Sequence, residues 1–316
     1  MNELRKDWMN NDVIILAKDR AKRPMDKSKS ENDKEILNDY EINCPFCRSN
    51  ENLTPNETFK IEKDNKWIVR CTNNKYPIVD DKCNDIYGFH EVMIDTYRHN
   101  GNFYNMKLEE FINLLIMYKH RYSEFVNKKN VEYISIFKNF LRRGGASLDH
   151  PHSQIISMSL VPADIQNEIA IAKDYYNTNN TCLYNDIIKK EIEYKKRVIN
   201  NSSKFLVIAP YASRYAGEVR ILFKENIRFE KIDNSYIEEL GSILYKLFKN
   251  LYKNNGYCPF NIYIHTHPIN INCDEYFNVH IHIVSRKYNY GGFELSTGMY
   301  VSSIDPDEFA QNIKFD

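Results

Sequence analysis

The chain has 316 residues, enough for one large domain or two modest ones, each with its own hydrophobic core. Its 43 basic and 43 acidic residues give a formal net charge of zero, which removes the main sequence argument for a nucleic-acid-binding or membrane-surface protein. No apolar segment approaches the length of about 18 residues that a membrane span needs, and the first residues lack a secretory apolar region. Seven irregularly spaced cysteines favour reduced thiols over a disulfide framework, so we expect a cytoplasmic protein.

The first third of the chain contains a basic loop and a cysteine pair. A short strand is predicted at residues 13–17, and the loop after it carries Arg20 and Arg23, which taken alone are best explained as solvated charge. Cys44 and Cys47 then form a C-x-x-C pair, typical of a redox centre, of two metal ligands or of two unrelated thiols. No βαβ pattern surrounds the pair, which weakens the redox interpretation. A tetrahedral zinc would need two further ligands from elsewhere.

Two strands and a long helix are predicted next. Residues 67–71 and 90–94 have the apolar content of strands, and His99, shortly after the second, is a possible third metal ligand. A lone histidine is more often an ordinary surface or core residue, so His99 matters only through its partners. Apolar residues recur every three or four positions from Leu108 to Phe125, which predicts an amphipathic helix.

The stretch that follows combines a glycine turn with two histidines. After a predicted buried strand at residues 131–137, a Gly-Gly pair at 144–145 permits a tight turn and close approach of the backbone to a ligand. His150, His152 and Gln154 occupy alternate positions, so in an extended chain their side chains share one face. The proline between the histidines favours a strand start or an edge strand. This combination points to chemistry on a phosphate.

The second half of the chain repeats the order of elements in the first. Helices are predicted from after Pro162 to about 177 and over about 183–199, strands at 205–209 and 218–223, a second apolar helix at 237–251, and strands at 260–265 and 277–284. The helix stripes start 129 positions apart (237 − 108), and the histidine pairs lie 130 positions apart (280 − 150). This shared offset predicts duplicated halves, residues 1–160 and 161–316. The second half lacks the glycine turn and the glutamine.

Histidine suits nucleophilic catalysis at phosphorus, because neutral imidazole is nucleophilic near pH 7 and its phosphoramidate readily passes the group on. His152 is the natural candidate, since Gln154 lies two residues further. An amide donates to a phosphate oxygen but cannot act as a base toward water, so glutamine there favours transfer over hydrolysis. The non-catalytic alternative is that both histidines are structural or bind metal.

Two groups of residues have the donor types of a metal site. The first, sufficient for a closed structural zinc, consists of Cys44, Cys47, His99 and His150. The second consists of Glu168, His265, His280 and His282. Their spacing alone establishes neither site, because the members are remote in sequence.

Several motifs together resemble the galactose-1-phosphate uridylyltransferase family. They run in matching order from about residue 3 to about residue 309 and so cover essentially the whole chain. The motifs are Glu3-Leu4-Arg5-Lys6-Asp7, Arg20-Ala21-Lys22-Arg23-Pro24, Cys44-Pro45-Phe46-Cys47, Thr96-Tyr97-Arg98-His99, Phe137-Lys138-Asn139, Gly145-Ala146-Ser147 and His150-Pro151-His152-Ser153-Gln154. The last is highly specific, whereas the basic loop alone is weak.

The resemblance implies an α+β fold of the histidine-triad superfamily, with two fused half-barrel repeats that each have an antiparallel sheet and a packed helix. It also implies ping-pong nucleotidyl transfer through a nucleotidyl-histidine, nucleotide-sugar and sugar-phosphate substrates, and a homodimer. By this resemblance His152 is the nucleophile and Gln154 the donor to the transferred phosphate. The expected substrate contacts are Ser147, Asn139, Asn74, Arg20 and Arg23.

The same resemblance extends to the metals and the sugar. Cys44, Cys47, His99 and His150 match the family's structural zinc ligands, and the second group matches a metal site found in some members, with zinc or iron as the candidate ion. Phe293 and Glu294 stand where the family binds the sugar, but residues 292–298 are more similar to shorter bacterial members and ADP-glucose phosphorylases. Leu141 and its two following arginines replace a smaller, more glycine-rich turn.

Our leading hypothesis from the sequence is a transferase that exchanges UMP between UDP-glucose and a hexose 1-phosphate such as galactose 1-phosphate. The first alternative is a phosphorylase that uses ADP-glucose or a dinucleoside polyphosphate with the same histidine. The second is an inactive zinc-containing nucleotide-binding module, and a hydrolase is disfavoured by Gln154. The sequence leaves open the base and the acceptor.

Overall fold

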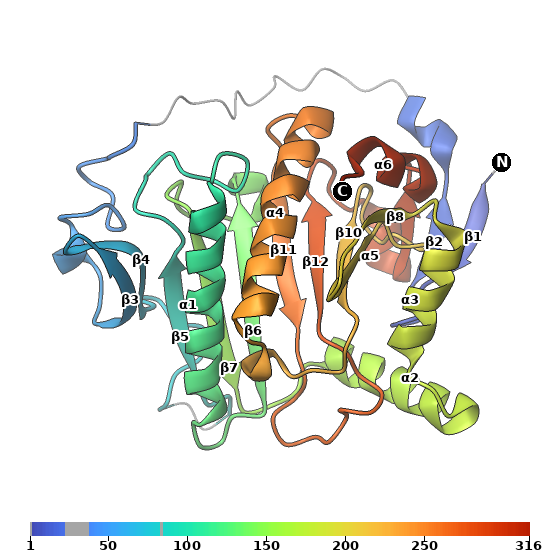
Figure 1. Cartoon of the computed structure of the whole chain (residues 1–316), viewed down its shortest axis with the longest axis horizontal. Coiled ribbons are helices and arrows are strands. Elements are labelled where there is room, and N and C mark those ends of the chain that lie inside the picture. The colour runs from blue at the N-terminus through green and yellow to red at the C-terminus, as the bar shows by residue number, and fades with distance from the viewer. Residues whose placement is uncertain (1, 23–37, 83–84) are drawn as a thin grey trace.

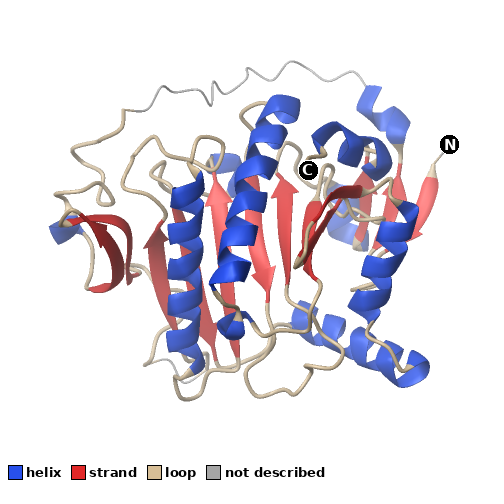
Figure 2. Ribbon diagram, viewed as in Figure 1, coloured by secondary structure: helices blue, strands red, loops and turns tan. Residues whose placement is uncertain are grey.

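The computed structural model describes residues 2–22, 38–82 and 85–316 and has an α+β fold built on one large antiparallel sheet (Figures 1 and 2). The ten strands lie in the order β3-β4-β5-β7-β6-β11-β12-β10-β9-β8. Those from the first half are β3 (Glu57–Lys63), β4 (Lys66–Asn73), β5 (Gly88–Ile94), β6 (Tyr133–Phe140) and β7 (His152–Met158). Those from the second half are β8 (Val198–Asn201), β9 (Phe205–Ile208), β10 (Val219–Phe223), β11 (Phe260–His265) and β12 (His280–Ser285).

Two long helices, α1 (Leu108–Val126) and α4 (Asn234–Asn255), lie side by side across one face of this sheet (Figure 1). Their apolar stripes pack against the strands in the main core, in which Phe111 and Leu247 are fully buried. The helices pack closely where α4 has Gly241, since a Cβ there would lie 3.0 Å from Cγ1 of Ile112. The helical periodicity predicted from the sequence is therefore that of the core-facing side.

The opposite face differs between the halves. In the second half, α2 (Ala163–Asn179) and α3 (Leu183–Tyr194) cover it and form a second core with Leu206 and Leu222. A small sheet of β1 (Glu3–Lys6), β2 (Val13–Leu16) and β13 (Met299–Ser302) lies beside it, with α5 (Gly292–Thr297) next to β13. The last helix, α6 (Pro306–Ile313), packs instead against α4 and β8, and its Phe309 belongs to the main core. Short 3-10 helices are η1 (Lys18–Lys22), η2 (Glu51–Leu53), η3 (Arg142–Gly144) and η4 (Phe229–Lys231). No helix among the described residues is long and apolar enough to cross a membrane.

Several sequence predictions differ from the structure at element boundaries. The helix expected over 183–199 ends at Tyr194, because Lys195 adopts a left-handed φ of 66° and the chain turns into β8. The strand expected over 277–284 begins at His280. β7 starts directly after Pro151, as expected for a strand start, but it is a central strand between β5 and β6 and not an edge.

The two halves of the sheet meet where β6 pairs with β11, and Lys138 lies opposite Ile262. Phe137, the residue before Lys138, pairs with Gln154 on β7. Asn261, the residue before Ile262, pairs in the same way with Val284 on β12. The strand ladder is therefore laid out alike on both sides of the junction.

This layout gives His152, at the start of β7, a counterpart on β12. Since Gln154 and Val284 are equivalent, His152 and His282, each two residues earlier, are also equivalent. The outer neighbours are Ile94 beside His152 and Arg220 beside His282. The strands thus form one continuous sheet with matching halves, and the division into half-barrel repeats at residue 160 stays a prediction.

Candidate active site and metal centres

The four residues of the first predicted metal group come together on the face of the sheet opposite α1. Cys44 and Cys47 lie in a turn before β3, His99 follows β5, and His150 immediately precedes β7. Their donor atoms lie within 4.8 Å of one another, and all four side chains are buried. The Cys47 Sγ is 3.5 Å from Nδ1 of His99 and 3.6 Å from Nδ1 of His150.

These distances fit a tetrahedral zinc. Zn–S bonds of about 2.3 Å and Zn–N bonds of about 2.0 Å place sulfur and nitrogen ligands roughly 3.6 Å apart. The outer contacts also fit, because His150 Nε2 donates to the Thr96 carbonyl at 2.9 Å and so keeps Nδ1 for a metal. Burial raises the pKa of the Cys44 thiol to about 12, so a cation is needed to hold it as thiolate there.

His152 begins β7 two residues beyond His150 and is 6% exposed. Its Nδ1 lies 2.9 Å from the His150 carbonyl oxygen, which can only accept, so Nδ1 carries the ring proton. The Nε2 lone pair of the neutral ring is then available as a nucleophile. Burial lowers the pKa of His152, and the nearby Lys138 ammonium lowers it further, which favours the neutral form.

A buried polar network supports the backbone of β7 from the side of α1. Lys138 is 1% exposed, and its Nζ donates to Asp95 Oδ2 at 2.5 Å and to the His152 carbonyl at 3.1 Å. Ser153 donates to the other Asp95 oxygen at 2.8 Å, and Tyr118 of α1 hydrogen-bonds to Ser153. The backbone of His152 is therefore tied to the core. Lys138 and Asp95 had no role in the sequence prediction.

Gln154 lies on the same face as His152 and is partly exposed. Its Oε1 is 2.8 Å from Nε2 of His90 on β5. His90 was read from the sequence only as the start of a strand. The register places it diagonally across from Gln154, which a sequence pattern cannot reveal without the pairing of β5 with β7.

The glycine turn between β6 and β7 is held from the second half of the chain. Asn261 of β11 donates through Nδ2 to Asn139 Oδ1 at 2.7 Å and to the Gly144 carbonyl at 2.6 Å. Gly145 has a φ of 89°, a conformation that favours glycine. Ser147 is exposed in the loop that leads to His150. Of the predicted contacts, Asn139 and Ser147 thus flank the nucleophile strand, and Asn261 was missed.

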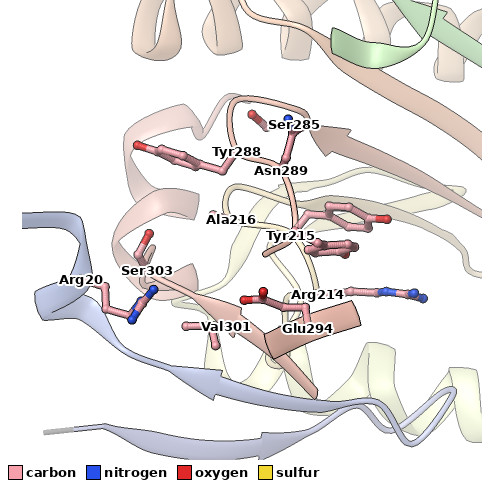
Figure 3. Close-up of a pocket in the computed structure, with 11 residues that line it drawn as sticks. Arg20, Arg214, Tyr215, Ala216, Ser285, Tyr288, Asn289, Glu294, Val301 and Ser303 are labelled. Carbon is pink, nitrogen blue, oxygen red and sulfur yellow. The ribbon is translucent and has the colours of Figure 1, made fainter. Parts of the chain in front are cut away.

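Arg20 and Glu294 line a different pocket (Figure 3). This pocket has a volume of about 240 Å³ and also includes Arg214, Tyr215 and Tyr288, but its lining does not include His152 or Gln154. Within one chain, this pocket therefore does not bring Arg20, a predicted basic contact, or Glu294, a predicted sugar contact, together with His152.

Three further predicted contacts have separate positions. Phe293 is 46% exposed beside Glu294 at the start of α5. Asn74 lies after β4, beside His90. Arg23 falls outside the described residues.

The second predicted metal group also comes together, on the same face of the sheet in the other half. The donor atoms of Glu168 on α2, His265 on β11, and His280 and His282 on β12 lie within 4.8 Å of one another. The Glu168 Oε2 is 3.0 Å from His265 Nδ1 and 3.4 Å from His280 Nε2. Burial opposes ionisation of Glu168, but His265 and His280 hold its pKa well below its usual range.

The outer contacts of this second group also fit a metal ion. His280 Nδ1 donates to the Asn278 carbonyl at 2.9 Å, and His282 Nδ1 lies 3.3 Å from Glu218 Oε1. The buried Nε2 atoms of both histidines have no hydrogen-bond partner among the described residues. Three imidazoles and a carboxylate suit zinc or iron. A pocket of about 390 Å³ reaches His265, His282 and Glu168.

A nucleotidyltransferase of the histidine-triad class is defined by this combination of an antiparallel sheet, a His-x-His strand and a glutamine beside the second histidine. Comparisons with known proteins narrow the class. Residues 105–315 match the model described as "Domain of unknown function (DUF4921)", and residues 25–161 match the N-terminal domain of DUF4931, also of unknown function.

Curated relatives and solved structures agree with this class. ADP-glucose phosphorylase of Arabidopsis thaliana is 30% identical over 98% of this chain and 91% of its own, and galactose-1-phosphate uridylyltransferase of Saccharomyces cerevisiae is 24% identical over 89% and 82%. The crystal structure of the Arabidopsis phosphorylase with bound ADP-glucose superposes with a TM-score of 0.87, at 28% identity, and covers 100% of this chain and 99% of that one. The chain belongs to the galactose-1-phosphate uridylyltransferase family, with similarity to its ADP-glucose phosphorylase-like members.

Proposed function

We propose that the protein transfers a nucleotidyl group from a nucleoside diphosphate hexose to a phosphate-bearing acceptor, through a covalent intermediate on His152. The observation that carries the proposal is the hydrogen bond from Nδ1 of His152 to the His150 carbonyl. It leaves the Nε2 lone pair for attack, on a strand whose backbone is fixed by a buried network. The family's enzymes, which include a phosphorylase and uridylyltransferases, support this reaction class.

The reaction has two steps. His152 Nε2 attacks the α-phosphorus, a P–N bond forms, and the bond to the β-phosphate oxygen breaks so that hexose 1-phosphate leaves with its electron pair. A phosphate oxygen of the acceptor then attacks the same phosphorus, and the P–N bond breaks to restore neutral His152. Gln154 donates an amide hydrogen to a phosphate oxygen as charge develops, and it offers no base for water.

The first substrates that we propose are ADP-glucose and inorganic phosphate, the sequence-based alternative. The support is the 30% identity to ADP-glucose phosphorylase over 98% of this chain, against 24% over 89% for the yeast uridylyltransferase. UDP-glucose with galactose 1-phosphate, the leading hypothesis from the sequence, is the second candidate. Its support is the specific His-Pro-His-Ser-Gln motif and the common chemistry.

In this proposal Asn74, Asn139 and Ser147 contact the nucleotide and its phosphates on the nucleophile side. Arg20, Arg23, Phe293 and Glu294 contact the sugar phosphate. Because the pocket of Arg20 and Glu294 does not include His152, we propose a homodimer in which each pocket completes the nucleophile site of the other subunit. In this proposal residues 1–160 provide the nucleophile, and residues 161–316 contribute the sugar contacts Phe293 and Glu294. We also propose a cytoplasmic location, as expected from the sequence.

We propose a structural zinc at Cys44, Cys47, His99 and His150, and a second zinc or iron at Glu168, His265, His280 and His282. The donor types and the outer hydrogen bonds of both groups support these assignments. The first metal would stabilise the segment that leads into β7. Every reacting group in the two steps belongs to the protein or the substrates.

Incubation with ADP-glucose or UDP-glucose, followed by intact-mass and peptide analysis, tests the proposal. We expect a mass increase of one nucleoside monophosphate on His152 and release of glucose 1-phosphate. The nucleotide that labels faster identifies the base. If neither nucleotide sugar modifies His152, transfer from a nucleotide sugar is wrong, and a dinucleoside polyphosphate phosphorylase or a zinc-containing binding module remains.

A further inference from the structure

Gln154 is useful to the transferred phosphate only if its NH₂ group, and not its carbonyl oxygen, faces the ligand. A glutamine amide can rotate by 180° about its terminal bond and exchange the two, so something must select the orientation. The relevant neighbour is His90, a 7% exposed side chain on β5 that has no part in the transfer steps above.

The tautomer of His90 is fixed by the backbone. The N–H of Ile78 donates to His90 Nδ1 at 3.2 Å, and a backbone N–H can only donate. A neutral imidazole that accepts at Nδ1 carries its proton on Nε2. Burial lowers the pKa of His90, which is consistent with the neutral ring.

The orientation of Gln154 follows from that tautomer. His90 Nε2 lies 2.8 Å from the terminal amide of Gln154, and since Nε2 is the donor, the facing atom must be the acceptor Oε1. The Gln154 Nε2 group then points away from His90, and no acceptor among the described residues bonds it. A rotated amide would bring two N–H donors together at this distance, which is unfavourable.

His90 also holds the segment after β4 that carries Asn74. The Asn74 backbone N–H donates to the His90 carbonyl at 2.9 Å, and Oδ1 of Asn74 accepts from the Tyr76 N–H at 2.8 Å. This second bond turns the Asn74 Nδ2 toward His90, 3.0 Å from Nε2. Because Nε2 donates to Gln154 Oε1, the Asn74 Nδ2 does not hydrogen-bond to it, and only the Gln154 amide has its N–H groups directed away from His90.

We propose that His90 is a positioning residue for nucleotidyl transfer, which orients the Gln154 amide so that its N–H groups face the transferred phosphate. The inference rests on the proposed function and adds a residue to it. The chain of contacts runs from the Ile78 N–H through the imidazole to Gln154 Oε1. His90 itself touches no reacting atom, so its effect must pass through Gln154.

The test compares the single-turnover rate of His152 labelling in four proteins: wild type, His90→Phe, Gln154→Ala and the double variant. Phenylalanine keeps a ring but has no donor. We expect His90→Phe to slow labelling about 10- to 100-fold, with a smaller change in the half-saturating substrate concentration. In the Gln154→Ala background, the same substitution should change the rate by no more than about twofold.

This cycle separates positioning from a structural role. His90→Phe also removes the partner of the Ile78 N–H, so some loss of stability is expected, but that loss would slow labelling equally in both backgrounds. Equal slowing in both therefore overturns the proposal. A wild-type protein that is not labelled by either nucleotide sugar would overturn the proposed function itself, which is a different result.

Two further variants sharpen the result. His90→Gln keeps a donor near the position of Nε2 and should retain more of the labelling rate than His90→Phe. His120→Phe is the matched control, since His120 is exposed and stacks on Phe59 of β3. It should label like the wild type. If His90→Phe also labels like the wild type, Gln154 needs no orienting partner and the inference is wrong.

Discussion

The same His-x-His pattern occurs at the start of β7 and in β12, at equivalent places in one sheet, yet the surroundings of the two pairs differ. Beside His152 lies the apolar Ile94, and two residues further the partly exposed Gln154. Beside His282 lies Arg220, which is buried and paired with Asp7 and Glu218. The position of Gln154 is taken by the buried Val284, so no amide can meet a phosphate there.

On the face of the sheet that packs against α1 and α4, the polar residues lie in the first half and the apolar residues lie in the second. Under β7 the polar side chains of Lys138, Asp95 and Ser153 form a buried network. The ladder places isoleucines at the equivalent positions in the second half, Ile262, Ile221 and Ile283. Buried ion pairs are weak sources of stability compared with apolar residues of similar size. The network under β7 is therefore best explained by control of geometry at His152, the proposed nucleophile.

The largest expected effect comes from removing the equivalent histidine from each of the two strands in turn. His152→Gly should lower the rate of nucleotidyl labelling by on the order of 10⁴-fold or more, because it removes the nucleophile. His282→Gly should leave labelling at His152 in place and lower the occupancy of the second metal site. Mass spectrometry and metal analysis of both variants check this. Labelling that survives His152→Gly would move the nucleophile elsewhere.

The next largest effect concerns the two metal groups, which should differ in how much folding stability is lost when one of their ligands is replaced. Cys44→Ser should cost several kcal/mol of folding stability and one zinc, because a closed structural site couples directly to folding. Glu168→Gln should cost less, since α2 and α3 still bury the surrounding apolar residues. Chemical denaturation with metal analysis measures both. Loss of metal from the Cys44 variant without loss of stability would contradict the structural role.

Local patterns predicted much of this comparison, but not the strand pairing that completes it. Helical periodicity identified α1 and α4, and the offset between histidine pairs predicted duplicated halves, with which the equivalent registers of β7 and β12 are consistent. The joining of β6 to β11 was not predicted, because local periodicity does not encode which strands pair. Lys138 has the sequence character of a surface residue, and only the contact with Asp95 explains its burial. For the same reason His90 and Asn261 emerged only from the register.

The buried network of Lys138, Asp95 and Ser153 allows its effect on folding stability to be measured separately from its effect on the labelling rate of His152. Lys138→Ile, which copies the second half, should cost about 3–5 kcal/mol because it leaves the Asp95 carboxylate buried without a cation. Adding Asp95→Leu should recover most of that loss, while labelling of His152 remains slow because its carbonyl has lost a donor. Denaturation and single-turnover labelling measure the two effects separately. Full recovery of both would make the network dispensable.

The smallest effect concerns the turn that the second half lacks. Leu141, just after β6, has a φ of 63°, a left-handed conformation that costs a leucine about 1–3 kcal/mol. Leu141→Gly removes this strain together with the packing of the partly buried leucine on the main core, and we expect relief of strain to dominate, with a net gain of about 1 kcal/mol or less and roughly 2 °C or less in Tm. Labelling should continue unchanged, because the Leu141 carbonyl still accepts from the N–H groups of Gly144 and Ala146.

Leu148→Gly is the matched control for this turn. Leu148 is an exposed leucine in the same loop and does not have a positive φ, so its replacement relieves no strain and should lower Tm slightly through the added freedom of the unfolded chain. A scanning calorimetry trace in which both variants lose stability equally would mean that the leucine at 141 is not strained. A gain at 141 alone would show that the first half tolerates a strained residue to form its phosphate-side turn, whereas β11 runs on to His265 without one.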